Sequence, residues 1–461
     1  MIPVTMAEII AFCGGELINV SCDTVIKKAE TDSRKDMTAG IFFALKGERF
    51  DAHDFVEQAM SNNAAVLCVQ KNRVSEKLPC WIVDDTLKAY QQLGKLMLKK
   101  NPVPCAAVTG SVGKTSVKEM TRAVLEQKFG SGKVLFTEGN TNNHIGVPQN
   151  LLRMTYEYQA AVIEMGTSSF GEIAVLTAIV EPEIAVVNSI APCHLENLCN
   201  LDGVAREKSS IFDCTSKTAV FPGNIPQTEI IVRTAAKRGL QCVRFGSCPA
   251  ENIDVYYSDF SGGIFESSFL LHCGTESVRI NWNLQGEHQA QNACAAASVG
   301  KYFGMTLSEI AAGLKNTVLP GMRAKITVCN GVNIYNDAYN ANPASMRAVL
   351  KMAAESVKNG EIAEKDLIFV IGDMLELGEN SAHEHLSLLE DFAEQLPQAQ
   401  VLAVGSNFMQ HADRFEMKFF ADSVEAGIFL RGIAHKGNWI FLKGSRSMHM
   451  ENALSGDDWK I

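Results

Sequence analysis

The stretch Val108-Thr109-Gly110-Ser111-Val112-Gly113-Lys114-Thr115-Ser116 is the most informative part of this chain. An apolar run at residues 105–108 predicts a buried strand, and apolar residues at helical spacing follow the stretch. A glycine-rich turn between a strand and a helix points backbone N–H groups at an anion. Its lysine adds positive charge, and the next hydroxyl can reach Mg²⁺. The stretch therefore predicts a nucleoside triphosphate site.

The spacing of this loop differs from the usual P-loop pattern, G-x-x-x-x-G-K-[ST]. Counting back from Gly113, the first glycine of that pattern would fall on Val108, so the chain has a shorter G-x-x-G-K-T form. The alternative interpretation is a glycine turn with a chance lysine. The strand before the loop and the helix after it favour the phosphate site.

Composition limits the classes of protein that fit. The 461 residues suggest about three domains at roughly 150 residues each, and 46% hydrophobic residues can supply ordinary cores. The formal net charge of −10, with no basic run, argues against nucleic acid or an anionic membrane as the main partner. A small anionic substrate stays compatible, because an acidic protein can carry a local basic pocket.

Targeting and cysteine signals indicate a cytoplasmic protein. The first residues lack the charged and apolar regions of a signal peptide, and no apolar run reaches the roughly 18 residues of a membrane span. The 13 cysteines are an odd number without a C-x-x-C pair, which is typical of small buried residues in a reducing compartment. We expect neither a zinc site nor a disulfide framework.

The pattern of apolar segments predicts an α/β fold in three units, residues 1–100, 101–320 and 321–461. Continuous apolar runs between helical patterns in the second unit predict a parallel sheet covered by helices on both faces. Alternating patterns after about residue 250 predict an antiparallel extension. The third unit again alternates buried strands with helices, without a G-x-G-x-x-G fingerprint.

Polar side chains follow the predicted strands of the second unit. Glu164 ends one strand, where Mg²⁺ is commonly held, although it could be an ordinary strand-end acid. His194 follows another strand and could bind metal or phosphate, although a single histidine is more often structural. Lys208 lies in a predicted helix and by itself would be a solvated surface lysine.

Three loops could also face a ligand. Residues 139–148 are rich in asparagine and glycine, residues 336–343 follow a strand that opens the third unit, and residues 443–447 place cations after another strand. Each could equally be a surface turn. Their positions after strands favour binding, since α/β folds bind ligands there.

Taken together, the motifs resemble the Mur ligase family over essentially the whole chain. In order, they are Thr-Gly-Ser-Val-Gly-Lys-Thr (109–115), Asn-Thr-Asn-Asn-His-Ile-Gly (140–146), Glu-Met-Gly (164–166), His-Leu-Glu (194–196), Asn-Asp-Ala-Tyr-Asn-Ala-Asn-Pro-Ala-Ser-Met (336–346), Gly-Asp-Met-Leu-Glu-Leu-Gly (372–378) and Lys-Gly-Ser-Arg-Ser (443–447). Each motif alone is modestly specific, whereas the ordered set is highly specific.

This resemblance implies a fold and an activity. The first unit would be a small UDP-binding domain, the second a P-loop ATPase domain, and the third a dinucleotide-fold-like domain that closes over ATP. The activity would be an ATP-dependent amide ligase that joins D-Ala-D-Ala to UDP-N-acetylmuramoyl-tripeptide (UDP-MurNAc-tripeptide) through an acyl phosphate. The product, UDP-MurNAc-pentapeptide, serves peptidoglycan synthesis. We expect a monomer with small-molecule substrates.

The resemblance also implies roles for individual residues. The catalytic set is Lys114, Glu164, His194 and Lys208. The ATP-binding set is Thr109, Gly110, Ser111, Val112, Gly113, Lys114, Thr115, Asn292, Arg323 and Asp337. The substrate-binding set is Ser33, Arg34, Lys46, Gly47, Asp51, His53, Thr141, Asn142, Asn143, Asn340, Ser445 and Arg446.

Two Mg²⁺ ions are implied as cofactors. Their ligands would be Thr115, Glu164, His194 and Lys208. The last would act after carbamoylation by CO₂, which turns a cation into a carboxylate-like ligand.

Two other functions stay open. A sibling amide ligase, either another Mur type or a folylpolyglutamate synthase type, would share the ATP site but use a different amino substrate. A P-loop regulatory NTPase would hydrolyse ATP slowly without an amino acceptor.

Overall fold

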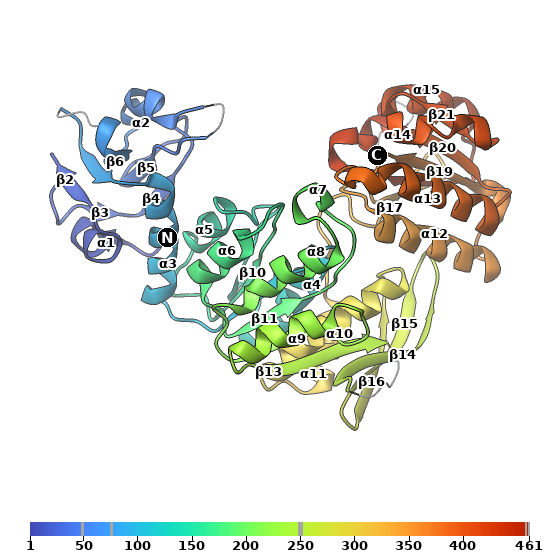
Figure 1. Cartoon of the computed structure of the whole chain (residues 1–461), viewed down its shortest axis with the longest axis horizontal. Helices are drawn as coiled ribbons and strands as arrows, with labels where there is room; N and C mark the ends of the chain where they lie inside the picture. The colour runs from blue at the N-terminus through green and yellow to red at the C-terminus, as the bar shows by residue number, and fades with distance from the viewer. Residues whose placement is uncertain (48–49, 74–76, 248–251, 457–458, 460–461) are drawn as a thin grey trace.

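The computed structural model describes residues 1–47, 50–73, 77–247, 252–456 and 459. The chain forms three α/β units in a row, with the first and third at opposite ends of the view (Figure 1). Within the described residues the larger sheets have five, nine and six strands, and each lies inside one of the three segments expected from the sequence. The predicted α/β class is confirmed, and we propose the segment limits at 101 and 321 as domain boundaries.

The first unit is built on the sheet β2-β7-β6-β5-β4, which is parallel except at β2. Its strands are β2 (Glu16–Ile18), β4 (Lys28–Glu30), β5 (Gly40–Phe43), β6 (Val66–Gln70) and β7 (Cys80–Val83), beside the ribbon β1 (Val4–Thr5) and β3 (Val25–Ile26). Its helices are α1 (Met6–Cys13), α2 (Val56–Ser61) and α3 (Thr86–Lys100). In the core, the Phe43 ring packs edge-on against Trp81 and Tyr90.

The central sheet has the order β16-β15-β14-β13-β12-β11-β8-β10-β9. Its strands are β8 (Cys105–Thr109), β9 (Val134–Phe136), β10 (Ala160–Glu164), β11 (Ile184–Val187), β12 (Thr218–Pro222), β13 (Gln241–Ser247), β14 (Val255–Gly262), β15 (Ser267–Cys273) and β16 (Glu276–Trp282). Pairing is parallel from β9 to β14 and antiparallel from β14 to β16. The expected antiparallel extension is therefore confirmed.

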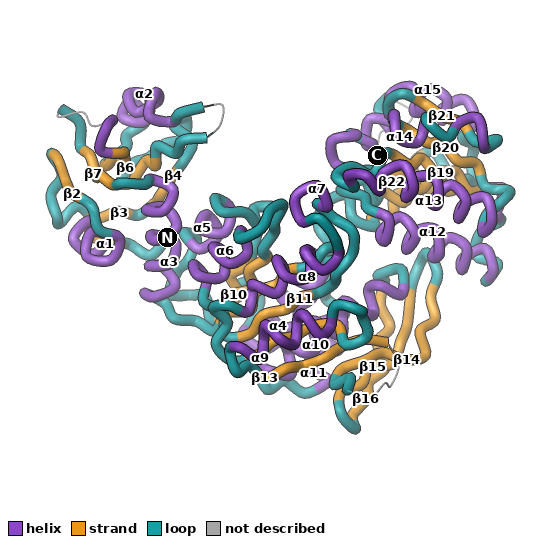
Figure 2. Tube along the Cα trace, viewed as in Figure 1, coloured by secondary structure: helices purple, strands orange, loops and turns teal. Residues whose placement is uncertain are grey.

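Helices cover both faces of this sheet (Figure 2). They are α4 (Lys114–Phe129), α5 (Gly146–Leu151), α6 (Glu172–Val180), α7 (Leu195–Leu198), α8 (Leu201–Ser209), α9 (Thr228–Lys237), α10 (Glu287–Tyr302) and α11 (Leu307–Lys315). Along β8, Ala106 and Val108 pack toward α4, α10 and α11, whereas Ala107 packs toward α6 and α9. A strand buried on both faces must be apolar at successive positions, which explains the continuous runs in the sequence.

The third unit has the sheet β17-β18-β22-β19-β20-β21, parallel except at β17. Its strands are β17 (Lys325–Cys329), β18 (Val332–Asn336), β19 (Leu367–Gly372), β20 (Gln400–Val404), β21 (Lys418–Phe420) and β22 (Trp439–Lys443). Its helices are α12 (Pro343–Lys358), α13 (Ser381–Gln395), α14 (Ser406–Met409) and α15 (Ser423–Ile433). Asn342 caps α12 by accepting the Ser345 N–H, and Pro343 occupies the first turn, where no hydrogen bond is lost.

Helix α3 joins the first unit to the central one. It packs on α5, and a Cβ at Gly94 would lie 3.1 Å from the Cα of Pro148. The Gln91 side chain also donates to the His144 carbonyl (3.0 Å), in the loop that precedes α5. The backbones of α3 and α5 therefore approach each other closely at Gly94 and Pro148. None of the described helices is long and apolar enough to cross a membrane.

We predict that Gly94→Leu lowers the temperature of thermal unfolding, because overpacking a close contact costs about 1–3 kcal/mol. The matched control is Gly432→Leu in α15, where a Cβ meets nothing within 4 Å and leucine improves helix propensity. Calorimetry of both variants checks the prediction. An unchanged Gly94→Leu transition would show that α3 and α5 separate without cost.

Candidate functional site

The site begins at the carboxyl edge of the central sheet. Strand β8 lies between β10 and β11, with Val108 opposite Glu164 and Thr109 opposite Val187. Because all three strands are parallel, the loops that leave them start side by side. The P-loop, the Glu164 side chain and the loop that carries His194 therefore meet at one place.

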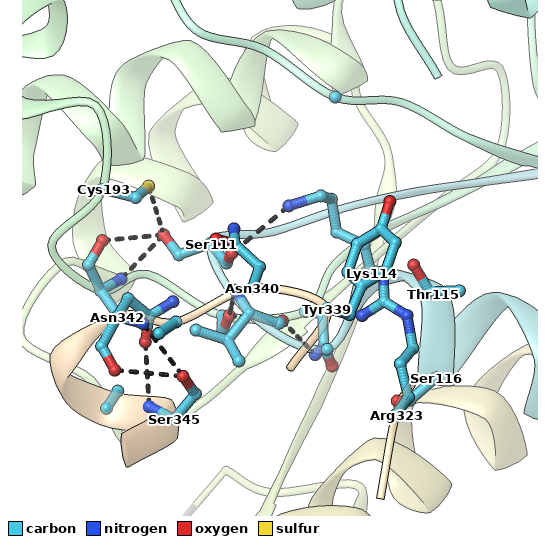
Figure 3. A pocket seen from close by; sticks show the side chains of 18 of the residues that line it. Ser111, Lys114, Thr115, Ser116, Cys193, Arg323, Tyr339, Asn340, Asn342 and Ser345 are labelled. Atoms are coloured by element: carbon cyan, nitrogen blue, oxygen red, sulfur yellow. Dashed lines mark hydrogen bonds between the residues drawn. The ribbon is translucent and has the colours of Figure 1, made fainter. Parts of the chain in front are cut away.

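A cavity of about 1080 Å³ opens at this edge and reaches the third unit (Figure 3). Many of the residues predicted for function line it. They are Ser111, Val112, Gly113, Lys114, Thr115, Asn142, Asn143, Glu164, His194, Asn292, Arg323, Asp337, Asn340, Ser445 and Arg446. Residues more than 300 positions apart in the sequence thus line the same cavity.

The P-loop is held in shape by its neighbours. Gly113 has a φ of 79°, and a Cβ there would lie 2.5 Å from Asn188 Nδ2 and 2.7 Å from Asn292 Oδ1. Asn188 Nδ2 donates to the Val112 carbonyl, and Ser189 Oγ accepts the Val112 N–H, each at 2.9 Å. Asn188 and Ser189 were not predicted as site residues, although their position directly after β11 is a usable signal.

Lys114 begins α4, and its side chain folds back over the P-loop. Its ammonium donates to the carbonyls of Gly110 (2.7 Å) and Ser111 (3.3 Å). Burial lowers the pKa of Lys114, while the nearby Glu164 acts in the opposite direction. A phosphate would offer this partly buried ammonium an anionic partner in place of the carbonyl oxygens.

Glu164 meets the requirements of a cation ligand. Its side chain is buried, and Oε1 accepts a hydrogen bond from Asn142 Nδ2 at 2.7 Å. Oε2 is buried without a hydrogen-bond partner among the described residues. A carboxylate oxygen left unpaired beside a cavity is costly unless a cation or a donor meets it there.

The remaining predicted metal ligands provide few fixed donors. In the described part of the chain, no three His, Cys, Asp or Glu side chains come close enough to bind a metal together. Thr115 lies at the first turn of α4, and His194 directly precedes α7. Such an open oxygen-rich set fits Mg²⁺, which keeps several waters and phosphate oxygens as ligands.

Lys208 is buried within the protein, so its interpretation as a solvated surface residue was wrong. It is 1% exposed on α8, beside Lys114 and Cys193 but outside the cavity lining. Burial, assisted by the positive charge of Lys114, lowers the pKa of Lys208 from 10.5 to about 8. The preceding Glu207 accepts N–H bonds from Gly171 (2.7 Å) and Ile173 (2.8 Å), which fixes α8 against α6.

Comparison with known proteins identifies the family. The family models described as "Mur ligase middle domain" and "Mur ligase, glutamate ligase domain" match residues 108–300 and 322–446. A UDP-N-acetylmuramoyl-tripeptide--D-alanyl-D-alanine ligase from Escherichia coli (strain K12) is 36% identical over 460 residues, 98% of each chain. The chain belongs to the Mur ligase family.

Two further relatives are similar over nearly the full length. A ligase of the same name from Haemophilus influenzae is 35% identical over 93% of each chain. A crystal structure of MurF from Acinetobacter baumannii superposes with a TM-score of 0.88 at 32% identity, covering 98% of both chains. The similarity therefore includes the first unit of this Mur ligase, which the two family models do not reach.

The third unit of the ligase completes the cavity wall. The Arg323 guanidinium stacks on the Tyr339 ring, 3.8 Å from its centroid (Figure 3). The Lys443 ammonium pairs with Asp337 Oδ2 and donates to the Asn340 carbonyl (3.1 Å), which ties the loop after β18 to β22. Ser445 Oγ accepts the Leu375 N–H at 2.9 Å. Tyr339 and Lys443 lie in loops that were expected to face a ligand, but neither was given a role of its own.

The predicted residues of the first unit lie apart from this cavity. Ser33 and Arg34 follow β4, whereas Lys46, Gly47, Asp51 and His53 follow β5. Arg34 forms a two-point ion pair with Asp32, with both contacts at 2.8 Å. His53 is buried and uses both ring nitrogens within the unit, one toward Asp51 and one toward the Gln70 N–H. Their role in substrate binding stays a prediction.

Three central residues also lie outside the cavity lining. Thr109 is buried and donates to the Met165 carbonyl (2.8 Å), and Gly110 supplies its carbonyl to Lys114. Thr141 donates to the Glu138 carbonyl and accepts from Asn150, so its hydroxyl is engaged within its own loop. Their predicted contacts with ligands stay predictions.

We predict that Gly113→Ala weakens nucleotide binding by at least about tenfold, because its Cβ cannot fit between two fixed amides. The control is Gly132→Ala, which carries similar left-handed strain (φ 74°) but meets no atom within 4 Å. Titration calorimetry with ADP compares the two. Equal affinities would show that the loop reshapes freely.

Proposed function

We propose that this Mur ligase joins D-Ala-D-Ala to UDP-MurNAc-tripeptide with the conversion of ATP to ADP and phosphate, forming UDP-MurNAc-pentapeptide. The observation that carries this proposal is the single cavity that unites the P-loop with the third-unit loops. The full-length relatives that bear this name support the choice of substrates. A regulatory NTPase would not need a second ligand-facing wall.

The chemistry follows from the charges involved. A peptide carboxylate is a poor acyl donor, so one of its oxygens first attacks the γ-phosphorus of ATP, and ADP leaves. The amine of D-Ala-D-Ala then attacks the carbonyl of the acyl phosphate, and phosphate leaves with the C–O bond pair. The first step brings two anions together and needs positive charge fixed in place before the reaction.

Lys114 supplies that charge. In the proposed reaction its ammonium exchanges the carbonyls of Gly110 and Ser111 for phosphate oxygens, at little cost in reorganisation because α4 already fixes its backbone. Thr109, Gly110, Ser111, Val112, Gly113 and Thr115 complete the phosphate loop. Mg²⁺, when bound by Thr115, Glu164, His194 and carbamoylated Lys208, would neutralise phosphate charge.

We assign the other predicted residues by their position around the cavity. Asn292 faces the adenine side, while Arg323 and Asp337 reach the phosphates and the ribose from the third unit. Asp337 already accepts from Ala324 and Lys443, but a carboxylate has further acceptor sites for a ribose hydroxyl. The dipeptide is received by Asn340, Ser445 and Arg446.

The muramoyl-peptide would extend from the first unit to the cavity. Thr141, Asn142 and Asn143 face its peptide part, and Ser33, Arg34, Lys46, Gly47, Asp51 and His53 bind the UDP part. Water would hydrolyse the acyl phosphate, so the third-unit loops also act by excluding it. We propose that the enzyme works as a cytoplasmic monomer on these small-molecule substrates.

The test is phosphate release with ATP, Mg²⁺ and UDP-MurNAc-tripeptide, with and without D-Ala-D-Ala. We expect release to depend on the dipeptide and to match pentapeptide formation. In Lys114→Ala the turnover should fall by at least about 10²-fold, because a preorganised charge is lost, while binding of the UDP substrate persists. Release that ignores the dipeptide would contradict the proposed acceptor.

A second prediction concerns carbamoylation of Lys208. Only the neutral amine reacts with CO₂, giving a carbamate and a proton, and a pKa of about 8 leaves much of Lys208 neutral near that pH. With ¹³C-bicarbonate we expect a carbamate NMR signal that weakens as the pH falls below about 8. Lys208→Met is the control. A signal that persists in this variant would belong to another amine.

A further inference from the structure

A close side-chain pair, His194 with Glu376, joins the central and third units at the cavity. His194 Nδ1 lies 2.7 Å from the Glu376 carboxylate, and both residues line the cavity. Among described residues, the other ion pair between these units is Lys351 with Glu287, where α12 meets α10. In Figure 1, α7, which His194 precedes, lies close to the third unit.

Both partners are held in place by their own units. His194 has a φ of 51°, and its carbonyl accepts the N–H groups of Asn197 (3.0 Å) and Leu198 (2.9 Å) at the start of α7. Glu376 has a φ of 65°, in a loop that follows β19. Left-handed backbone in residues other than glycine is costly and persists only where surrounding structure imposes it.

Contacts of the residues around Glu376 explain how its left-handed backbone conformation is maintained. The N–H of Met374 donates to the buried His385 Nε2, and the N–H of Leu375 donates to Ser445 Oγ, each at 2.9 Å. Leu377 is buried in the third-unit core. The side chain of Glu376 is 62% exposed, so it makes no packing contribution that would explain its rigid presentation.

The contact also favours one tautomer of the neutral His194 imidazole. A carboxylate can only accept, so Nδ1 is the ring nitrogen that carries a hydrogen in this contact, and in the neutral imidazole Nε2 then keeps its lone pair. Within the described part of the chain, Nε2 makes no hydrogen bond, so it stays available to a ligand of the cavity. Pairing of one ring nitrogen with a carboxylate is a general way to orient a histidine toward a metal.

We propose that Glu376 is a positioning residue: it accepts the Nδ1 hydrogen of His194 across the unit boundary and fixes the imidazole with Nε2 free for the cavity. A residue of the third unit thereby orients the imidazole of His194, which belongs to the central unit. The inference rests on the proposed function for its catalytic consequence, but the contact itself is independent of the reaction.

The first experiment observes the imidazole directly. In protein labelled with ¹⁵N-histidine and free of nucleotide, ring-nitrogen NMR reports the tautomer, and His194→Gln assigns the signal. We expect His194 to hold its hydrogen on Nδ1 in the wild type and in Glu376→Gln, whose amide oxygen still accepts. Glu376→Ala should lose this preference. Unchanged His194 signals in Glu376→Ala would overturn the proposal.

The second experiment measures turnover. Loss of a carboxylate that orients a histidine typically costs about 10- to 100-fold, so Glu376→Ala should lose that much kcat, with an unchanged KM for the UDP substrate. Glu376→Gln should recover most of the loss. The matched control, Glu379→Ala, changes an exposed acid three positions further along and should leave kcat unchanged. A Glu376→Ala enzyme with wild-type kcat would overturn the positioning role.

The two experiments separate the possible failures. If the wild type releases no phosphate in response to the dipeptide, the proposed function fails, yet the tautomer measurement still decides the contact. If the wild type is active and the tautomer of Glu376→Ala is unchanged, only the positioning role fails.

Discussion

The pairing of β8 with β10 on one side and β11 on the other is the constraint on which the site depends. Because the three strands are parallel, the loops that follow them leave the sheet at the same edge. The register, which places Val108 opposite Glu164 and Thr109 opposite Val187, fixes where each loop begins. The buried Cβ positions of β8 hold α4 on one face and α6 on the other. The position of the phosphate loop therefore follows from the sheet.

A second property of the site is that several of its charged side chains are held by other groups of the protein. Lys114 is bound to loop carbonyls, Lys443 to Asp337, and Arg323 lies over Tyr339. In the proposed reaction, these ordered groups would exchange protein partners for ligand atoms. Exchange of this kind avoids the entropy cost of ordering long side chains, which favours a reaction between anions.

Sequence predicted the class of fold, the P-loop and many of the residues that line the cavity, because these follow from apolar periodicity, glycine spacing and the position of residues after strands. It could not predict the burial of Lys208, since a lysine on a helix is ordinarily solvated and only packing by distant elements reverses that. The pair His194–Glu376 was also out of reach, because it depends on how two units face each other. Asn188, by contrast, stood directly after β11 and could have been found.

The close packing of α3 on α5 has a consequence for substrate choice. A helix of 15 residues is about 22 Å long, and contact at Gly94 prevents it from sliding along its neighbour. In the proposed reaction the uridine end is held by the first unit, and the carboxylate of the tripeptide must reach Lys114. A precursor one amino acid shorter would lose up to about 3.5 Å of reach, which is large beside the tolerance of a near-attack geometry. In the proposed reaction, the packing of α3 on α5 therefore fixes the distance that the muramoyl-peptide must span.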